Sequence, residues 1–261
     1  MRTMDLTGIE AAQKPVFFCS FGKDSAAVLH ALQPWLHKTM VVFIDCGGVF
    51  PDIVDWAHKE GAKLPKFFYL HPTGDIWQDI HTKGWATDIE LADIGRHSDL
   101  LAPTEMAYRH KTRPWTQCVM ERFWIPGFVF TQMYKPDLYI SGEKRLDRPF
   151  ANDWETRTHG VAKALRPVFD WSDSEVWEYI DANGIELAPT FRDRQADRRD
   201  CYLCFGHGLT INRVQYLKDK YPDLYKKVFF EEGLSELVPI MVDQLRKTLG
   251  TWEQIQGLLE E

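Results

Sequence analysis

The sequence lacks the features that mark membrane, secreted and nucleic-acid-binding proteins. No apolar run approaches the roughly 18 residues that a membrane-spanning helix needs. The first residues, MRTMDLTGIEAAQ, lack the basic and apolar regions of a signal peptide. A formal net charge of −7 argues against a general nucleic-acid-binding surface. The five cysteines are odd in number and unevenly spaced, which argues against a disulfide framework. We therefore expect a cytoplasmic protein whose thiols are free or bound to metal.

The apolar content is sufficient for a sizeable core, since 44% of the 261 residues are hydrophobic and 13% are aromatic. Helix-like segments alternate with apolar segments, which predicts an α/β fold with a doubly wound, mainly parallel sheet. Residues from about 210 onward read as helical, so we expect an α/β domain over residues 1–190 and a helical C-terminal subdomain over 191–261. The apolar segments resemble strands buried on both faces: residues 16–19, 39–45, 66–70 and 137–141.

Three further segments carry local structural signals. Residues 84–112 show little periodicity, and we expect an irregular excursion there that serves as a lid or partner surface. Pro126 and Gly127 are expected to break or kink a preceding helix. Ser172 and Glu175 form an S-x-x-E capping box, which predicts the start of a helix.

The segment SFGKDS, residues 20–25, joins the first apolar strand to a helical pattern. A helix N-terminus offers unpaired backbone N–H groups and a partial positive charge, so it suits an anion. Gly22 permits close approach of the backbone to a ligand, and Lys23 adds a full positive charge. The spacing excludes a Walker P-loop. The alternative is an ordinary strand-to-helix turn with a surface lysine.

Two more segments follow expected strands. In DCGGVFPD, residues 45–52, Asp45 can face a sugar or adenine edge, or it can be satisfied locally in a tight turn. In SGEKRLDR, residues 141–148, the three cations suit a sulfate or phosphate, with a solvated charged loop as the alternative. Because ligands of such sheets bind at the carboxyl ends of the strands, we expect these loops to share a site.

The segment CYLCFGH places Cys201, Cys204 and His207 at metal-ligand spacing, and Cys118 is a candidate for a further thiolate. Zinc fits these four ligands. An iron–sulfur cluster prefers four thiolates and would need Cys19 or Cys46 as well. Metal binding is the favoured interpretation, and the alternatives are a redox dithiol or two buried structural cysteines with a surface histidine.

Together these motifs resemble the phosphoadenosine phosphosulfate (PAPS) reductase-like family of the PP-loop ATP pyrophosphatase superfamily, whose fold is termed adenine nucleotide alpha hydrolase-like. SFGKDS is similar to the family's SGGKDS loop, with Phe21 in place of a glycine. DCGGVFPD, SGEKRLDR and RPVFDWSDSEVW are similar to its later motifs and occur in its order. The resemblance implies catalytic Lys23, Asp24 and Arg145. It also implies nucleotide contacts from Ser20, Phe21, Gly22, Lys23, Asp24, Ser25, Asp45 and Gly47, and anion contacts from Lys144, Arg145, Arg148 and Arg166.

The resemblance implies an enzyme that acts on the phosphate or phosphosulfate chain of ATP or PAPS, in sulfur or adenylyl/pyrophosphate transfer, with Mg²⁺ if the ligand is ATP. One alternative is a thioredoxin-dependent PAPS reductase. Those reductases use a cysteine in a C-terminal E-C-G-x-H tail, and this sequence has no cysteine after Cys204. A second alternative is a non-catalytic nucleotide- or metal-binding accessory subunit. Expected partners are thioredoxin or a protein sulfur donor, and a homo-oligomer is compatible with the sequence.

Overall fold

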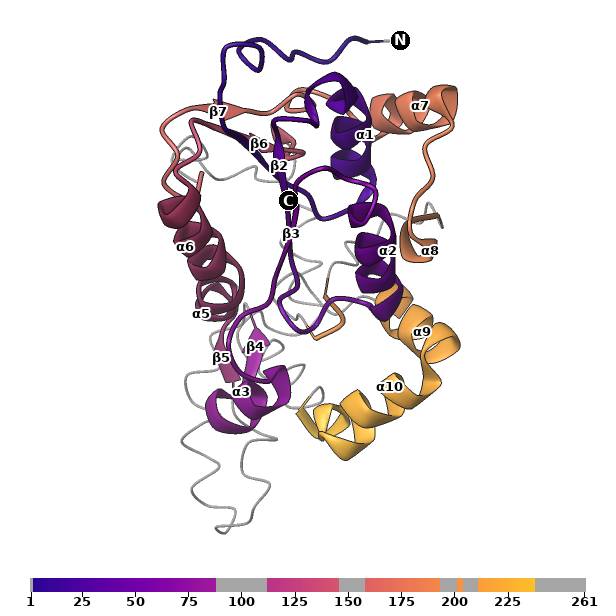
Figure 1. The fold of residues 1–261 in the computed structure, drawn as a ribbon. Coiled ribbons are helices and arrows are strands. Elements are labelled where there is room, and N and C mark those ends of the chain that lie inside the picture. Colours follow the sequence, from indigo (N-terminus) through magenta and orange to yellow (C-terminus); the bar gives the residue numbers. More distant parts are fainter. Residues whose placement is uncertain (1, 88–111, 146–157, 193–200, 204–210, 238–261) are drawn as a thin grey trace, which may run out of the picture. The chain divides into compact units, whose positions relative to one another are not determined.

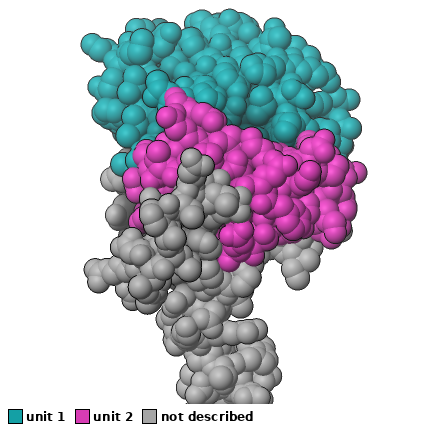
Figure 2. Space-filling model, turned by 90° about the horizontal axis from the view of Figure 1, so that it is seen from below, with its two compact units in different colours: residues 1–73, 120–201 teal, residues 74–119, 202–261 magenta. Residues whose placement is uncertain are grey.

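The computed structural model describes residues 2–87, 112–145, 158–192, 201–203 and 211–237. The chain forms two compact units (Figure 2). The first unit comprises residues 1–73 and 120–201, and the second comprises residues 74–119 and 202–261. The two units are described separately below. Segments distant in sequence meet within each unit, so neither unit is a simple consecutive block of the chain.

The first unit is built on a five-stranded sheet in the order β3-β2-β1-β6-β7, whose pairs are all parallel (Figure 1). Phe17, in the middle of β1, lies opposite Val41 on one side and Ile140 on the other. The residues of β1, β2 and β6 are all buried, which explains their nearly continuous apolar sequences. The predicted α/β class is confirmed. The strands are β1 Pro15–Phe18, β2 Met40–Ile44, β3 Phe67–Leu70, β6 Leu138–Ser141 and β7 Ala164–Leu165.

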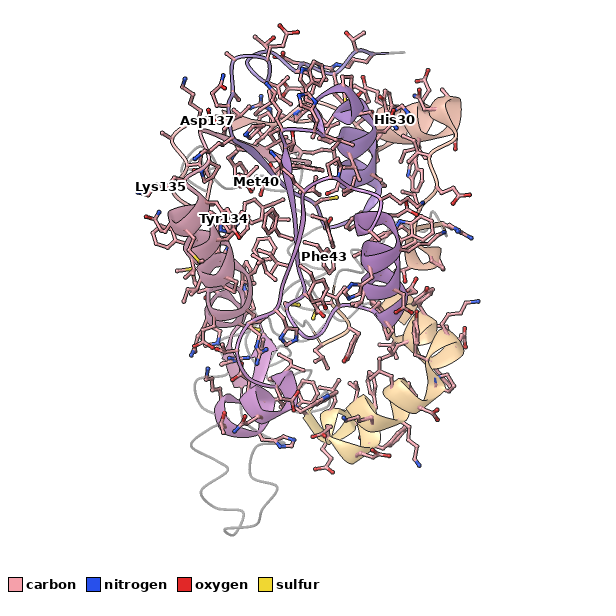
Figure 3. All side chains as sticks on the ribbon, viewed as in Figure 1. His30, Met40, Phe43, Tyr134, Lys135 and Asp137 are labelled. Carbon is pink, nitrogen blue, oxygen red and sulfur yellow. The ribbon has the colours of Figure 1, made fainter. Side chains whose placement is uncertain are left out.

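Helices cover both faces of this sheet (Figure 1). On one face α1 contacts α7 and α2 contacts α8. His30, labelled in Figure 3, extends from α1, and its Nδ1 lies 3.1 Å from the hydroxyl of Tyr179 in α7. On the other face Phe130 of α6 packs against the core residues Phe18 and Tyr139. The helical elements are α1 Lys23–Ala31, η1 Gln33–Trp35, α2 Pro51–Gly61, η4 Met120–Trp124, α6 Ile125–Tyr134, α7 Asp173–Asn183 and α8 Pro189–Arg192.

Pro126 and Gly127 do not break the helical segment, so this part of the expectation is wrong, and the expected kink stays a prediction. The π-helical turn η4 leads directly into α6, and Pro126 lies in the first turn of α6. A proline removes one hydrogen bond of a regular α-helix, and the π-helical turn directly before Pro126 is where that regular pattern is already interrupted. Gly127 is required for packing, since a Cβ at this position would lie 2.3 Å from the ring of His159.

His159 lies in an aromatic cage on the α6 face of the sheet. Its ring is 4.3 Å from the ring of Phe18 and 4.4 Å from that of Trp124. Only 3% of the residue is exposed, and its Nδ1 donates to the carbonyl oxygen of Trp124 at 3.2 Å. Burial lowers the pKa of His159 to about 4, so the imidazole is neutral at ordinary pH.

In the part of the second unit that the structure describes, short helices accompany one pair of parallel strands. His81 Nε2 lies 2.6 Å from Glu232 Oε2, and the Lys227 ammonium lies 4.3 Å from the centre of the Trp77 ring. The expected helical C-terminal region is present, whereas most of the expected irregular excursion lies outside the described residues. The elements are α3 Ile76–Lys83, β4 Trp85–Thr87, β5 Thr112–Pro114, α5 Trp115–Val119, α9 Ile211–Lys220, α10 Pro222–Lys226 and η7 Lys227–Glu231.

Among the helices that the structure describes, none has both the length and the apolar character needed to cross a bilayer.

Candidate functional site

The loop between β1 and α1, residues 20–25, lies at the switch point of the sheet. From β1 the chain proceeds to β2 and β3 on one side, and β6 and β7 pair on the other. Gly22 is the N-cap residue of α1, and its N–H donates to Ser20 Oγ at 3.3 Å. Ser20 Oγ also lies 3.1 Å from Ser25 Oγ. These contacts hold the loop around the N-terminus of α1, where a parallel sheet of this type binds ligands.

Phe21 adopts a left-handed backbone conformation, with φ of 57°. Its ring is 2% exposed and packs 5.8 Å from the ring of Phe43 and 6.2 Å from that of Phe67. A left-handed phenylalanine is uncommon, and burial of the ring offsets the strain of this conformation. The side chain that replaces the family's glycine is therefore directed into the core.

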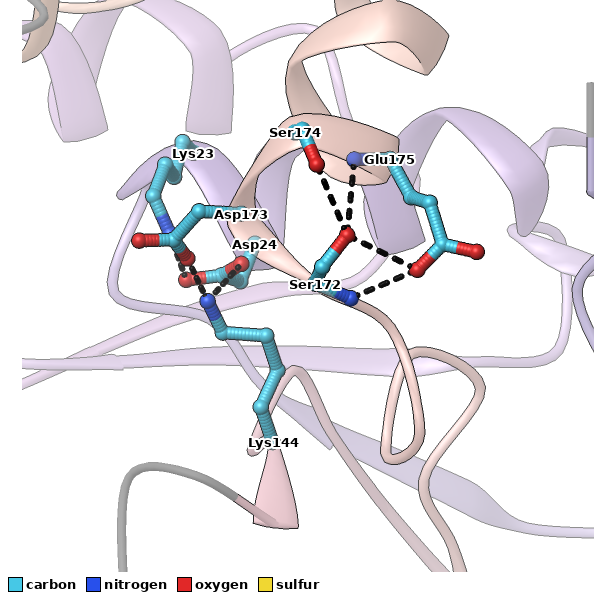
Figure 4. A network of polar contacts seen from close by, with 7 residues as sticks. All are labelled: Lys23, Asp24, Lys144, Ser172, Asp173, Ser174 and Glu175. Atoms are coloured by element: carbon cyan, nitrogen blue, oxygen red, sulfur yellow. Dashed lines mark hydrogen bonds and ion pairs between the residues drawn. The ribbon is translucent and has the colours of Figure 1, made fainter.

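Four charged side chains meet at the start of α1 (Figure 4). Lys23 Nζ lies 2.8 Å from Asp24 Oδ2 and 2.9 Å from Asp173 Oδ1. Lys144 Nζ lies 3.3 Å from Asp24 Oδ1 and also contacts Asp173 Oδ1. The lysine–aspartate cluster, defined as Lys23, Asp24, Lys144 and Asp173, thus joins the loop after β1, the segment after β6 and the first turn of α7.

Charge pairing controls the ionisation of this cluster. Burial alone would lower the pKa of Lys144, but its hydrogen bond to Asp173 and the charge of Asp24 raise that pKa above its ordinary value. Burial would raise the pKa of Asp173, whereas hydrogen bonds from Lys144 and Lys23 lower it. Lys144 and Asp173 are therefore held in their charged forms at neutral pH.

Gly142 allows the segment after β6 to reach the loop. A Cβ at this position would lie 2.9 Å from the backbone nitrogen of Ser25 and 3.0 Å from the carbonyl carbon of Asp24. The missing side chain lets the two backbones touch, which brings Lys144 two residues later into the cluster.

The capping box predicted at the start of α7 is confirmed. Ser172 Oγ accepts a hydrogen bond from the Glu175 N–H, and Glu175 Oε2 accepts one from the Ser172 N–H. The cap fixes the backbone on either side of Asp173, which occupies the first turn of the helix. The helix ends at Gly184, which adopts the left-handed conformation common at helix C-termini.

Asp45 lies at the carboxyl end of β2 and is 8% exposed. One carboxylate oxygen accepts from the Gly47 N–H at 2.8 Å, and the other accepts from the Tyr69 hydroxyl. Burial and this bond raise the pKa of Tyr69 above its ordinary value. Asp45 thus has local partners, while its loop is at the same edge of the sheet as residues 20–25.

The remaining predicted anion ligands lie in different surroundings. Two nitrogens of Arg145 donate to Asp170 Oδ1, at 2.9 and 2.7 Å, and the guanidinium lies over the Phe169 ring. Arg166 is buried and its Nε lies 3.3 Å from Glu143 Oε2. Lys144 is the predicted ligand that reaches residues 20–25, and Arg148 lies outside the described residues.

The predicted metal ligands are only partly described. Cys118 belongs to the second unit and Cys201 to the first, where it pairs with Val49 in an antiparallel bridge. Cys204 and His207 lie outside the described residues. Within the described part of the chain, no group of three or more acidic, histidine or cysteine side chains is arranged to hold a metal ion. The four-ligand metal site remains a prediction.

Sequence reasoning missed two residues beside the loop. Asp173 gave no signal beyond its place in the capping segment. Phe191 of α8 approaches the loop closely, since its ring would lie 3.5 Å from a Cβ on Gly22. Thr190 anchors α8 by donating its N–H and hydroxyl to Asp52 of α2, each at 2.6 Å. No periodicity or motif in the sequence connects residue 52 with residue 190.

Several curated proteins are similar to the chain. An uncharacterized protein of Methanocaldococcus jannaschii is 21% identical over 252 residues, covering 93% of this chain and 52% of that protein. A phosphoadenosine 5'-phosphosulfate reductase of Xylella fastidiosa is 23% identical, covering 69% of this chain and 68% of that protein. Subunit 2 of a sulfate adenylyltransferase of Caulobacter vibrioides is 23% identical, covering 69% of this chain and 58% of that protein. The chain thus spans about half the length of the first of these relatives.

The fold is similar to a crystal structure of phosphoadenylyl-sulfate (PAPS) reductase from Candida auris in a phosphate complex. The TM-score is 0.50 at 13% identity, over 74% of this chain and 84% of that chain. A sequence profile of the phosphoadenosine phosphosulfate reductase domain matches residues 14–206. This match covers most of the chain and includes the loop, the cluster and α7. The resemblance seen in the motifs is confirmed: the chain belongs to the phosphoadenosine phosphosulfate reductase domain family.

Proposed function

We propose that the protein binds the phosphate or phosphosulfate chain of ATP or PAPS at residues 20–25 and acts on it, in sulfur or adenylyl/pyrophosphate transfer. The observation that carries this proposal is the lysine–aspartate cluster. Two strand-end segments and a helix N-terminus converge there, and they place Lys23 and Lys144 beside the first turn of α1. Two ammonium groups and a helix N-terminus form a strong site for a polyanion.

The chemistry that this geometry favours is electrostatic. Lys23 and Lys144 would stabilise negative charge that develops on the phosphoryl oxygens, together with the N–H groups at the start of α1. Asp24 contacts both lysines and would hold their ammonium groups in position. Arg145 would act at the distal anion after leaving Asp170. Mg²⁺ would arrive on the phosphates of ATP, because it commonly binds through substrate phosphates.

The test is a binding and turnover screen with ATP, PAPS and adenosine, measuring calorimetric affinity together with release of pyrophosphate and sulfite. We expect ATP or PAPS to bind, and Lys23→Ala to lose about 100-fold in turnover. Lys63→Ala is the matched control, since Lys63 is exposed and pairs only locally with Glu60 among the described residues. Absence of binding by both nucleotides would overturn the proposal. Binding that survives Lys23→Ala without any product would favour an accessory subunit.

Thioredoxin-dependent PAPS reduction is the second candidate, and the relatives named as PAPS reductases support it. This reaction needs a thiolate nucleophile. Cys19 is a poor one, because burial raises the pKa of its thiol to about 12 and leaves 2% of the residue exposed. Cys46 follows β2 at the edge of the sheet that carries the loop and is partly exposed. Sulfite release with thioredoxin that is lost in Cys46→Ser but retained in Cys19→Ser would establish this role.

Cys118, Cys201, Cys204 and His207 would be the ligands of a zinc ion or an iron–sulfur cluster. The described residues do not test whether these side chains come together, so no reaction step is assigned to a metal. Elemental analysis and an absorption spectrum of the purified protein would distinguish zinc, an iron–sulfur cluster and a free dithiol.

A further inference from the structure

Asp173 stands where an incoming phosphate would be expected. Its carboxylate oxygen Oδ1 lies 2.9 Å from Lys23 Nζ and also contacts Lys144 Nζ. We infer that Asp173 is an internal competitor, which occupies the anion position between the two lysines until a ligand displaces it. This inference rests on the proposed function, because it concerns the regulation of the same site.

The carboxylate of Asp173 has no essential part in starting α7. Ser172 and Glu175 already exchange the two hydrogen bonds of the capping box. The hydrogen bonds and ion pairs that the structure gives the Asp173 carboxylate go to Lys23 and Lys144 (Figure 4). Its position therefore reflects attraction to the lysines, although its backbone is fixed by the helix.

Exposure distinguishes Asp173 from the other members of the cluster. Its side chain is 57% exposed, compared with 21% for Lys23 and 4% for Lys144. The Asp24 side chain is 22% exposed; it follows Lys23 in the loop and contacts both lysines. Asp173 therefore covers the lysine pair on the side that faces solvent, from which a ligand must approach.

The charges explain why this arrangement would hold anions back. Two ammonium groups face two carboxylates, so the cluster has no net charge in the closed arrangement. Withdrawal of Asp173 leaves one net positive charge beside the N-terminus of α1. The apparent dissociation constant of every ligand that needs both lysines is then the intrinsic constant divided by the fraction of open protein. The same factor should apply to each such ligand, and adenosine should be unaffected.

The experiment compares wild-type protein with Asp173→Asn, which keeps the shape of the side chain and removes its charge. Calorimetry measures the affinities for inorganic pyrophosphate, ATP and adenosine. Glu178→Gln is the matched control, because it makes the same change in net charge at an exposed position of α7. We expect Asp173→Asn to bind pyrophosphate and ATP about five-fold more tightly, a factor at the upper end of what an exposed ion pair contributes. The control and the adenosine affinity should remain unchanged.

The outcomes separate this inference from the proposed function. Equal or weaker pyrophosphate binding by Asp173→Asn would overturn the inference, since Asp173 would then position the lysines. An equal gain in Glu178→Gln would also overturn it, because net charge alone would explain the result. If neither protein binds ATP but Asp173→Asn gains affinity for pyrophosphate, the inference stands and the proposed function fails. If no anion binds either protein, both fail.

Discussion

The lysine–aspartate cluster and the His159 cage lie in the same unit and hold ionisable groups in opposite ways. In the cluster, each lysine contacts two carboxylates, and these contacts raise the pKa of Lys144 despite its burial. In the cage, His159 is surrounded by aromatic rings, and burial lowers its pKa to about 4 so that it loses its charge. The cluster keeps charged groups that a ligand can contact, whereas the cage keeps the imidazole uncharged.

The contrast between His159 and the cluster shows how to separate ionisable groups with a packing role from those with a functional role. A pKa shifted mainly by burial among rings, as in His159, indicates a packing role. Charges that are held in place by opposite charges at the carboxyl ends of strands indicate a site that can exchange partners. Four predictions test this distinction, in order of decreasing effect.

Phe21→Ala should lower the free energy of unfolding by about 3 kcal/mol, because it removes a fully buried ring at a left-handed position. Pyrophosphate affinity should stay within about two-fold, as the ring points into the core. Denaturant unfolding and calorimetry measure the two effects. Phe21→Gly is the control and should lose about 1 kcal/mol less than alanine, since glycine adopts this conformation without strain. A gain in affinity with intact stability would contradict this and show that the ring obstructs the loop.

Gly127→Ala and Gly142→Ala probe one region each. A Cβ on Gly127 would clash with the His159 ring, which cannot move between Phe18 and Trp124, so stability should fall by about 2 kcal/mol. A Cβ on Gly142 would displace the backbone at Ser25, so pyrophosphate affinity should fall about ten-fold. Denaturant unfolding and calorimetry of both variants give a matched comparison. Similar losses of affinity in the two would show that the regions are not independent.

His159 should make stability depend on pH below neutrality. Its folded pKa of about 4 is below the unfolded value of 6.5, so the unfolded chain binds the proton first as pH falls. The stabilisation is complete above pH 7 and decreases through the range from 6.5 to 4, by about 2 kcal/mol at pH 5. His159→Phe should remove this component of the pH dependence, measured by urea unfolding at pH 7 and pH 5. His37→Gln, at an exposed position, should leave it intact. An unchanged profile in His159→Phe would disprove the assignment.

Ser172→Ala should lower stability by about 1 kcal/mol through loss of the helix cap. Ser174→Ala is the control, since Ser174 is exposed and contacts Ser172 without capping the backbone. Its loss should be below about 0.5 kcal/mol. Thermal unfolding of the two variants decides the matter, and equal losses would mean that the cap contributes little to α7.

Local patterns were sufficient to predict four strands of the sheet, the loop at residues 20–25 and the cap of α7, but not the two-residue strand β7. Each of these depends on residues that are close in sequence, such as Ser172 and Glu175, or on a continuous apolar run. The family's motifs named Lys144 as an anion ligand, which stays a prediction, and its contact with Asp24 was not expected from sequence.

The rest could not be predicted because it depends on contacts between distant residues. Asp173 reaches Lys23 across 150 positions, and only the folded sheet brings them together. The direction of the Phe21 ring depends on Phe43 and Phe67, which belong to other strands. Pro126 was expected to break or kink a helix, yet the helical segment continues through it, from the π-helical turn η4 into α6.

The central place of β1 has a consequence for the motion of residues 20–25. Pro15–Phe18 is paired along both edges, with β2 on one side and β6 on the other. The backbone amides of Val16, Phe17 and Phe18 should therefore be among the slowest in the chain to exchange with deuterium. The loop that follows is attached to this slowly opening strand, so sub-global opening at β7 or β3 can occur while residues 20–25 keep their native arrangement.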